Sequence, residues 1–192
     1  AAVYYDAKDI PQGFLLYWVE EDVFHIREMV YLTQEARKGL WNFIRAHYSM
    51  IDAVKGHIYT GEPLAFLLDE SQIQETIEPY FMARIVDVAQ FLRLYPFEGS
   101  IRPFHFVVTD PMAEWNNGIF SVATDREGTV SVTDEPAGKA VELDIQTLSA
   151  MLMGYKRPSY LARIERLHTD KRTLRLLEEI IPDGQPYFSD YF

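Results

Sequence analysis

The residues of this sequence with the clearest potential for chemistry lie at its end. Four aromatic residues fall within the last six positions: Tyr187, Phe188, Tyr191 and Phe192. Chain ends usually fray unless they are anchored, but leaving these side chains in water costs about 25 cal/mol per Å² of apolar surface. We therefore predict that the tail docks onto the fold. Docking would bury the α-carboxylate of Phe192, raise its pKa and make it a usable base. The alternative interpretation is a purely hydrophobic latch.

The other titratable residues are less informative. No two histidines are spaced i, i+4, and we interpret each one as satisfied by hydrogen bonds rather than as catalytic; they are His25, His47, His57, His105 and His168. Short acidic clusters could attract an amine, but charged residues are mostly solvated. The chain has no Cys, no HExxH zinc motif, no Walker A loop and no GxSxG elbow. We therefore expect no metal site and no thiol nucleophile.

Composition limits the class of protein. The chain has 192 residues, 48% of them hydrophobic, which is enough for one domain or two small ones with a buried core. A net charge of −11 argues against nucleic-acid binding. The apolar runs are far shorter than the roughly 18 residues of a membrane span, so we expect a soluble, cytoplasmic protein. Because the sequence opens on Ala1 rather than Met, we expect it to begin partway along a longer polypeptide.

Residues 1–80 have the pattern of part of a mixed α/β sheet. Residues 13–19 and 23–32 are rich in aromatic and branched side chains, and an acidic turn between them predicts two paired strands. Thr33 is the expected N-cap of a helix whose apolar positions recur every three or four residues. Weaker patterns predict strands at 53–59 and 64–68 and a short helix that begins at Ser71 and ends before Pro79.

Residues 81–192 predict a sheet followed by helices, which is the α+β class. A strand at 82–86 precedes a helix that is capped by Asp87 and stopped by Pro96. Short connections then favour an antiparallel meander of four strands, at 102–109, 118–124, 129–133 and 140–143. The helical periodicity that follows predicts one helix from Asp144 to a cap at Gly154, one that begins at Pro158 and carries Leu167, and one capped by Thr169.

Four segments together resemble one known family. They are Gln34 to Ile44 (QEARKGLWNFI), Tyr80 to Val88 (YFMARIVDV), Leu143 to Gly154 (LDIQTLSAMLMG) and the terminal Asp190 to Phe192 (DYF). Their order and spacing resemble the C-terminal half of the Eis family, the "enhanced intracellular survival" N-acetyltransferases of the GNAT superfamily. The resemblance covers essentially the whole chain.

The resemblance implies a domain map and a cofactor. Residues 1–80 would be the latter part of a central GNAT-like domain, and residues 81–192 a C-terminal domain like sterol carrier protein 2 (SCP2), with an antiparallel sheet and helices. Acetyl-CoA would be bound by an N-terminal GNAT domain that this sequence lacks. Consistent with that, the chain has no Gln/Arg-x-x-Gly-x-Gly/Ala loop of the kind that holds the cofactor's pyrophosphate at a helix start.

The resemblance also implies a catalytic role for the chain terminus. In the family, the terminal carboxylate is the general base for the attacking amine, and Phe192 is the matching residue here. Asp190 and Tyr191 would line the substrate pocket, although Tyr191 departs from the acidic residue of the mycobacterial member. The implied reaction is acetyl transfer from acetyl-CoA to a small-molecule or peptide amine, without a metal. The implied partners are the N-terminal GNAT domain of the same protein and further copies of the chain in a homo-oligomer, a hexamer in the family.

Two other interpretations of the chain stay open. In one, the second region is a non-catalytic SCP2-like module that binds a lipid or another apolar ligand between its sheet and helices. In the other, the chain only supports oligomerisation. As a lipid-binding module or an oligomerisation unit, the isolated chain would have no acetyltransferase activity. The isolated chain is expected to be inactive also if it is part of an acetyltransferase, because the domain that binds the cofactor would be missing.

Overall fold

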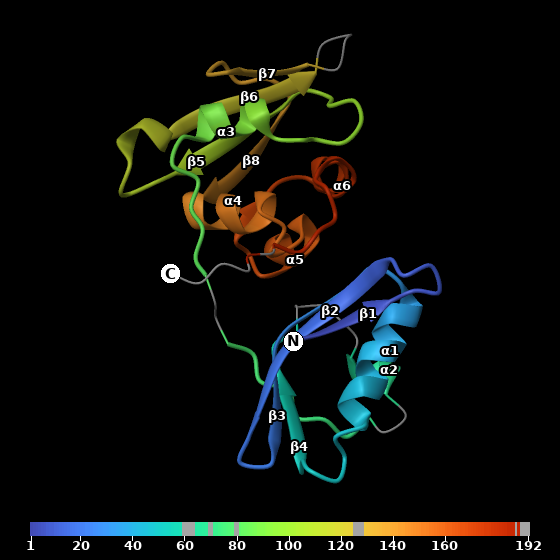
Figure 1. Ribbon diagram of the computed structural model, residues 1–192. Coiled ribbons are helices and arrows are strands. Elements are labelled where there is room, and N and C mark those ends of the chain that lie inside the picture. The colour runs from blue at the N-terminus through green and yellow to red at the C-terminus, as the bar shows by residue number, and fades with distance from the viewer. Residues whose placement is uncertain (59–63, 69–70, 79–80, 125–128, 187, 189–192) are drawn as a thin grey trace. The chain divides into compact units, whose positions relative to one another are not determined.

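The computed structural model describes residues 1–58, 64–68, 71–78, 81–124, 129–186 and 188 (Figure 1). The chain divides into two compact units, residues 1–73 and 74–192. Each unit has its own sheet and its own cluster of buried apolar side chains. Both sheets are mixed and both units contain helices. The expected α+β class is therefore confirmed.

The N-terminal unit is a four-stranded sheet with one long helix. Its elements are β1 (Ala2–Tyr5), β2 (Pro11–Glu20), β3 (Val23–Tyr31), α1 (Gln34–Arg45), β4 (Ala53–Gly56) and α2 (Leu64–Leu67). The sheet has the order β1-β2-β3-β4, and only the β3–β4 pair is parallel. The two strands expected on either side of the acidic turn are confirmed. Glu21 and Asp22 have φ values of 48° and 58°, as a tight turn between right-twisted strands requires.

Helix α1 lies against one face of this sheet (Figure 1). The Thr33 hydroxyl accepts a hydrogen bond from the backbone N–H of Ala36 at 3.1 Å, so the predicted N-cap is confirmed. Leu40 and Ile44 of α1 are buried with Leu15 and Phe24 of the strands. The connection from β3 through α1 to the parallel strand β4 is a βαβ unit, which places α1 over the sheet.

Two of the weaker expectations for this region are wrong, and one is too long. Residues 64–67 form helix α2 rather than a strand, because a short continuous apolar run has no periodicity that distinguishes the two. Residues 71–78 form no helix; Ile77 is 95% exposed, and an unpacked single turn does not recover the cost of helix nucleation. The strand expected at 53–59 is present over Ala53–Gly56; residues 57 and 58 form no strand, and residue 59 lies outside the described residues.

The C-terminal unit is a five-stranded sheet with four α-helices and one short 3-10 turn among its described residues. Its elements are α3 (Val88–Leu94), β5 (Phe104–Thr109), η1 (Glu114–Asn116), β6 (Gly118–Thr124), β7 (Val130–Thr133), β8 (Lys139–Asp144), α4 (Ile145–Leu152), α5 (Pro158–Arg163), β9 (Leu167–His168) and α6 (Lys171–Ile180). The strand order is β7-β6-β5-β8-β9. All four expected strands of the meander are present.

The sheet nevertheless differs from the expected antiparallel meander. Strand β8 pairs with β5 in parallel rather than with β7. The segment between β7 and β8 therefore has to cross to the other side of β5, and two contacts fix that crossing. The Ser121 hydroxyl accepts from Ala137 N–H at 3.0 Å. Gly138, at φ 69°, lies so close to the Pro103 carbonyl that a Cβ would sit 1.8 Å from its oxygen.

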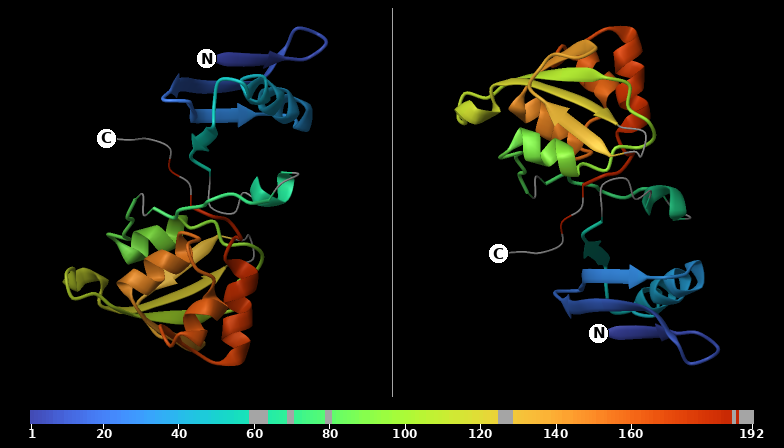
Figure 2. Two further views of the ribbon diagram at one scale, coloured as in Figure 1. Left: turned by 90° about the horizontal axis from the view of Figure 1, so that it is seen from below. Right: turned by 90° about the horizontal axis from the view of Figure 1, so that it is seen from above.

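The helices of this unit bury one face of its sheet, as Figure 2 shows from two sides. The inward-facing side chains of β5, Phe104 and Phe106, are at most 1% exposed and pack with Leu148 and Met151 of α4. Asp87 caps α3 by accepting from the Gln90 backbone N–H, as expected, and Asp144 caps α4 by accepting from the Thr147 backbone N–H. The expected cap at Gly154 has a φ of 76°. This apolar layer is the larger of the two cores.

Three local expectations for this unit are wrong. Residues 82–86 form no strand. Leu167 belongs to β9, because the helix that starts at Pro158 ends at Arg163. The N-cap of α6 is Asp170 rather than Thr169; the Thr169 hydroxyl instead donates to the Ala140 carbonyl oxygen at 2.7 Å. In the last two cases a partner on β8 determines the structure.

Candidate functional site

The expected site residues Asp190, Tyr191 and Phe192 lie outside the described residues, as does Tyr187. The structure therefore does not test the predicted position of the terminal carboxylate. It does describe residues 181–186 and Phe188, which lead from the end of α6 towards the terminus. We call the described residues 181–186 and Phe188 the tail approach.

Arg157, the N-cap residue of α5, holds the start of the tail approach. Its Nη1 donates to the carbonyl oxygens of Ile181 and Pro182 at 3.0 and 3.1 Å. Its Nε donates to Oε2 of Glu178 at 2.9 Å, and its Nη2 donates to the Glu178 carbonyl oxygen at 2.7 Å. A guanidinium group can make several such bonds at once because its donors form a rigid planar fork. The chain therefore leaves α6 in a direction that Arg157 determines.

Glu178 in turn keeps its charge beside Arg157. Burial by itself would raise the pKa of Glu178, but hydrogen bonds from Ser159 and Arg157 outweigh it and lower the pKa below its ordinary value. The backbone N–H of Ser159 donates to Oε1 at 2.6 Å. Arg157 and Glu178 thus form an ion pair at 2.7 Å that joins α5 to α6 at the point where the tail approach begins.

Two further contacts direct the tail approach. Gly154 lies under it, and a Cβ on Gly154 would sit 2.1 Å from the carbonyl oxygen of Gly184. Farther along, the ring of Phe188 lies 5.6 Å from the ring of Phe81, a normal distance for an aromatic pair. Phe188 is 40% exposed. Phe188 thus contacts the fold, while docking of the other three terminal aromatic residues, which lie outside the described residues, stays a prediction.

We expect Arg157→Gln to loosen the tail approach. The variant loses donors to two carbonyl oxygens and to Glu178, and hydrogen bonds to charged groups contribute about 1.5–3 kcal/mol each. Hydrogen–deuterium exchange of the Ile181 amide, which donates to the Leu177 carbonyl oxygen, should therefore speed up roughly tenfold or more. Arg163→Gln is the matched control, since the described contact of Arg163 is with the ring of Tyr160. Equal exchange in both variants would show that Arg157 does not hold this segment.

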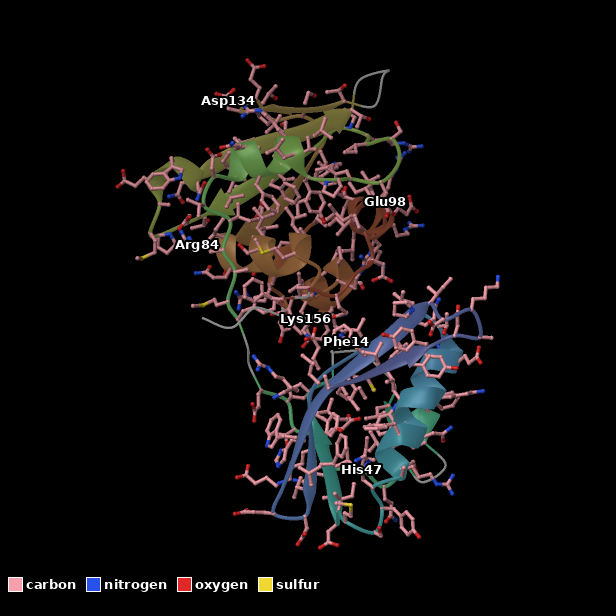
Figure 3. All side chains as sticks on the ribbon, in the orientation of Figure 1. Phe14, His47, Arg84, Glu98, Asp134 and Lys156 are labelled. Atoms are coloured by element: carbon pink, nitrogen blue, oxygen red, sulfur yellow. The ribbon has the colours of Figure 1, made fainter. Side chains whose placement is uncertain are left out.

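A second polar cluster fixes residues 84–88, which lead into α3 (Figure 3, where Arg84 is labelled). Nη2 of Arg84 lies 2.6 and 2.7 Å from the carboxylate oxygens of Asp110, whose side chain is fully buried. Asn116 donates to the same carboxylate at 2.9 Å and to the Val86 carbonyl oxygen at 3.0 Å. The loop after β5 is thereby tied to residues 84–88.

Hydrogen bonds keep Asp110 ionised. Burial would raise its pKa, but hydrogen bonds from Asn116, Arg84 and two backbone N–H groups together lower the pKa to about 2. Among the residues that the structure describes, no buried side-chain polar atom lacks a partner. A carboxylate with this many donors and this low a pKa is a structural anchor rather than a proton acceptor at neutral pH.

Sequence reasoning missed both clusters. An Asp directly after a strand is a common turn residue, so Asp110 could have been assigned to a turn. Its partner Arg84 is 26 residues away, however, and no local pattern indicates that pairing. Arg157 and Glu178 are likewise 21 residues apart. Only folding brings these residues together.

The start of α1, where a strand leads into a helix, is not a pyrophosphate site for acetyl-CoA. Such a site needs free backbone N–H groups and the positive end of a helix dipole. Here the Thr33 hydroxyl occupies the Ala36 N–H, and Glu35 places a carboxylate in the first turn. A negative side chain at this position repels an anionic ligand.

Two of the five histidines make ordinary contacts with backbone carbonyl oxygens. His105 Nδ1 lies 3.0 Å from the Ala137 carbonyl oxygen, and His47 Nδ1 lies 2.9 Å from that of Phe43. Among the described residues there is no group of three or more His, Cys, Asp or Glu side chains that could hold a metal ion. Over the same residues, no helix is long and apolar enough to cross a membrane.

The two folds define the class of this protein. A small sheet with a βαβ crossover, joined to a larger sheet whose helices cover one face, is a combination of a GNAT-like and an SCP2-like domain. The chain belongs to the sterol carrier protein domain family, whose model matches residues 88–189, more than half of the sequence. The model of the acetyltransferase (GNAT) domain matches residues 1–85. The expected combination of a GNAT-like and an SCP2-like domain is thereby confirmed, whereas nothing in these matches supports the description of the chain as a C-terminal half.

Solved structures resemble the chain over almost its whole length. A conserved protein from Enterococcus faecalis, named "Probable N-Acyltransferase", is 31% identical over 99% of the chain, with a TM-score of 0.91. A GCN5-related N-acetyltransferase from Anabaena variabilis is 27% identical over 96% of the chain, with a TM-score of 0.81. Eis1 from Mycobacterium abscessus, 19% identical over 94% of the chain with a TM-score of 0.73, shares the fold.

The chain spans about half the length of these proteins: 49%, 48% and 48% of the three. No match to the chain was found among curated proteins. The comparisons thus establish a GNAT-type N-acyltransferase fold with a sterol-carrier-type domain.

Proposed function

We propose that the chain is part of a longer GNAT-type N-acetyltransferase, in which it shapes the substrate pocket and supplies its terminal carboxylate as general base. The observation that carries this proposal is the tail approach. Arg157, Gly154 and Phe81 direct the last described residues along a defined path. A free chain end would need no such path, whereas a base must be held within hydrogen-bond distance of the proton that it removes.

The chemistry assigned to this chain is limited to proton removal and substrate binding. An amine that is protonated at neutral pH must lose a proton before it can attack, and the carboxylate of Phe192 would accept that proton. Asp190 and Tyr191 would line the pocket, and Asp190 would favour a cationic small-molecule or peptide amine. The acetyl donor, acetyl-CoA, is assigned to residues outside this chain, because the start of α1 does not fit its pyrophosphate.

The expected surroundings of the enzyme belong to the same proposal. Its partner would be an N-terminal GNAT domain of the same protein, and the protein would act as a homo-oligomer in the cytoplasm, as the Eis-type resemblance implies. The half-length match to the solved relatives supports the longer chain. Reading the encoded sequence on the N-terminal side of Ala1 tests this directly. A GNAT domain with its phosphate loop is expected there, and its absence would overturn the proposal.

The isolated chain is expected not to bind acetyl-CoA. Isothermal titration should give no binding, or a Kd weaker than about 1 mM. The protein extended by its upstream GNAT domain should bind the cofactor and serves as the positive control. A micromolar Kd for the 192-residue chain would show that the cofactor site lies in the chain itself, against the assignment made from Thr33 and Glu35.

The structure does not favour the alternative of a lipid-binding module. The space between the second sheet and its helices is filled by Phe104, Phe106, Leu148 and Met151, all at most 1% exposed. A hollow of about 300 Å³ on this unit is instead lined partly by charged side chains, among them Glu142 and Arg166. An apolar ligand would have to displace packed core residues.

A further inference from the structure

The sheet of the N-terminal unit has a second face, opposite α1. Side chains alternate between the two faces of a strand. Tyr17 and Phe24 pack with residues of α1, and their rings are stacked 4.7 Å apart. Their neighbours Trp18 and His25 therefore point to the opposite side. Those two rings are also stacked at 4.7 Å, with 3° between their planes. We call this side the outer face.

Apolar side chains form a row along β1 and β2 on the outer face, and Val30 of β3 extends it. The strand register aligns Val3 with Phe14 and Phe14 with Val30 across β1, β2 and β3. Leu16 and Trp18 continue the row along β2. Val3 and Trp18 are 49% and 47% exposed, and Phe14 is labelled in Figure 3. Isolated exposed apolar residues are common, but a contiguous apolar surface marks an interaction site.

The outer face is basic at one end. A hollow of about 250 Å³ lies there, lined by Trp18, His25, Ile26, Arg27, Lys55, Gly56 and His57. Lys55 lies opposite His25 in the register. Within the described part of the chain, no carboxylate lies within ion-pair distance of Arg27 or Lys55; Glu28 lies farther along, opposite Leu16. Arg27 and Lys55 thus place two positive charges at this end of the outer face, in a chain with a net charge of −11.

We propose that the outer face is the docking surface for the part of the longer polypeptide that corresponds to the unmatched half of the solved relatives. This inference rests on the longer chain of the proposed function and specifies where that chain attaches. The docking partner would present an apolar surface to Val3, Phe14, Leu16, Val30 and Trp18. At its edge a carboxylate would enter the hollow beside Arg27 and Lys55.

Two observations select this occupant. Helix α1 covers one face of this mainly antiparallel sheet, and the other face carries exposed apolar residues such as Val3 and Trp18 rather than the polar side chains of a solvated face. The relatives that share the fold are twice as long as this chain, so a polypeptide of sufficient size exists to cover the other. The basic hollow adds charge complementarity, which selects an acidic partner edge over a second copy of the same basic face.

Oxidative footprinting of the tryptophans tests the proposal, because Trp18 and Trp115 are both exposed and lie in different units. N-bromosuccinimide should modify Trp18 readily in the 192-residue chain. In the protein extended by its encoded upstream sequence, Trp18 should react about tenfold more slowly. Trp115 should react at the same rate in both and is the internal control. In the extended protein, Leu16→Asp should restore the reactivity of Trp18, because it places a carboxylate in the apolar surface.

Three results would overturn the proposal: equal reactivity of Trp18 in both proteins, the absence of an encoded upstream segment, or concentration-dependent protection of Trp18 in the chain alone. The last result, with a dimer in light scattering, would assign the outer face to a second copy. The footprint is independent of acetyl transfer. Protection of Trp18 in an inactive extended protein would retain the docking surface and reject the catalytic role.

Discussion

Adding one alanine after Phe192 is expected to reduce acetyl transfer by the extended enzyme about 10²- to 10⁴-fold, the usual contribution of a positioned acid or base. The addition keeps every aromatic side chain of the tail but moves the terminal carboxylate by one residue, about 3.3–3.6 Å along the chain. A base at that distance no longer reaches the same proton. The measurement is kcat/KM for an amine substrate as a function of pH. The fall in kcat/KM at low pH that reports protonation of the carboxylate base should be absent from the variant.

Phe192→Leu is the matched control for this experiment. It keeps a terminal carboxylate at the same position and an apolar side chain, so most of the activity should remain. If the two variants lose activity equally, the aromatic ring rather than the carboxylate is what matters, and the tail is a hydrophobic latch. If neither loses activity, the terminus has no part in the reaction.

Asp110→Asn is expected to lower the melting temperature of the C-terminal unit by roughly 10 °C, the largest stability effect expected of the described polar residues. The amide keeps the shape of the carboxylate but removes the negative charge. Arg84 would then lose its ion pair at 2.6 Å, and one of the donors now satisfied by Asp110 would face an NH₂ group. Asp134→Asn is the control, because Asp134 is an exposed carboxylate in the same unit.

The pH dependence of stability gives a second measurement of the same effect. Because folding lowers the pKa of Asp110 from the ordinary 3.8 to about 2, its stabilising contribution is fully present above pH 3.8 and is lost as the pH falls towards 2. Acid unfolding of the wild type should include this loss, and that of Asp110→Asn should not. Parallel acid-unfolding curves for the two proteins would contradict the assignment.

The helix caps and hairpins of this protein could be predicted from its sequence because each depends on residues that are near neighbours in the chain. Thr33, Asp87 and Asp144 cap helices through N–H groups three residues away. The turn after Glu20 joins two apolar strands directly. Such features need no knowledge of the rest of the fold.

The predictions that proved wrong are those in which a distant partner outweighs the local pattern. Residues 82–86 have apolar and branched side chains, yet they form no strand, because Arg84 binds Asp110 and Ile85 N–H donates to the Ser149 hydroxyl. Residues 71–78 have a capping pattern, yet Ile77 finds no apolar partner to bury it. In both cases tertiary contacts, or their lack, decide the local structure.

By itself, the sequence determined the α+β class, the principal strands and helices with most of their caps, and an aromatic terminus that would be costly to leave in water. The tertiary structure decided that β8 lies beside β5, that Arg84 pairs with Asp110, and that Arg157 and Gly154 direct the tail approach. The physical reason is chain separation. Bonds between near neighbours form at little entropic cost, whereas contacts between residues 20 or more positions apart form only when the packing of whole elements offsets the loop-closure entropy.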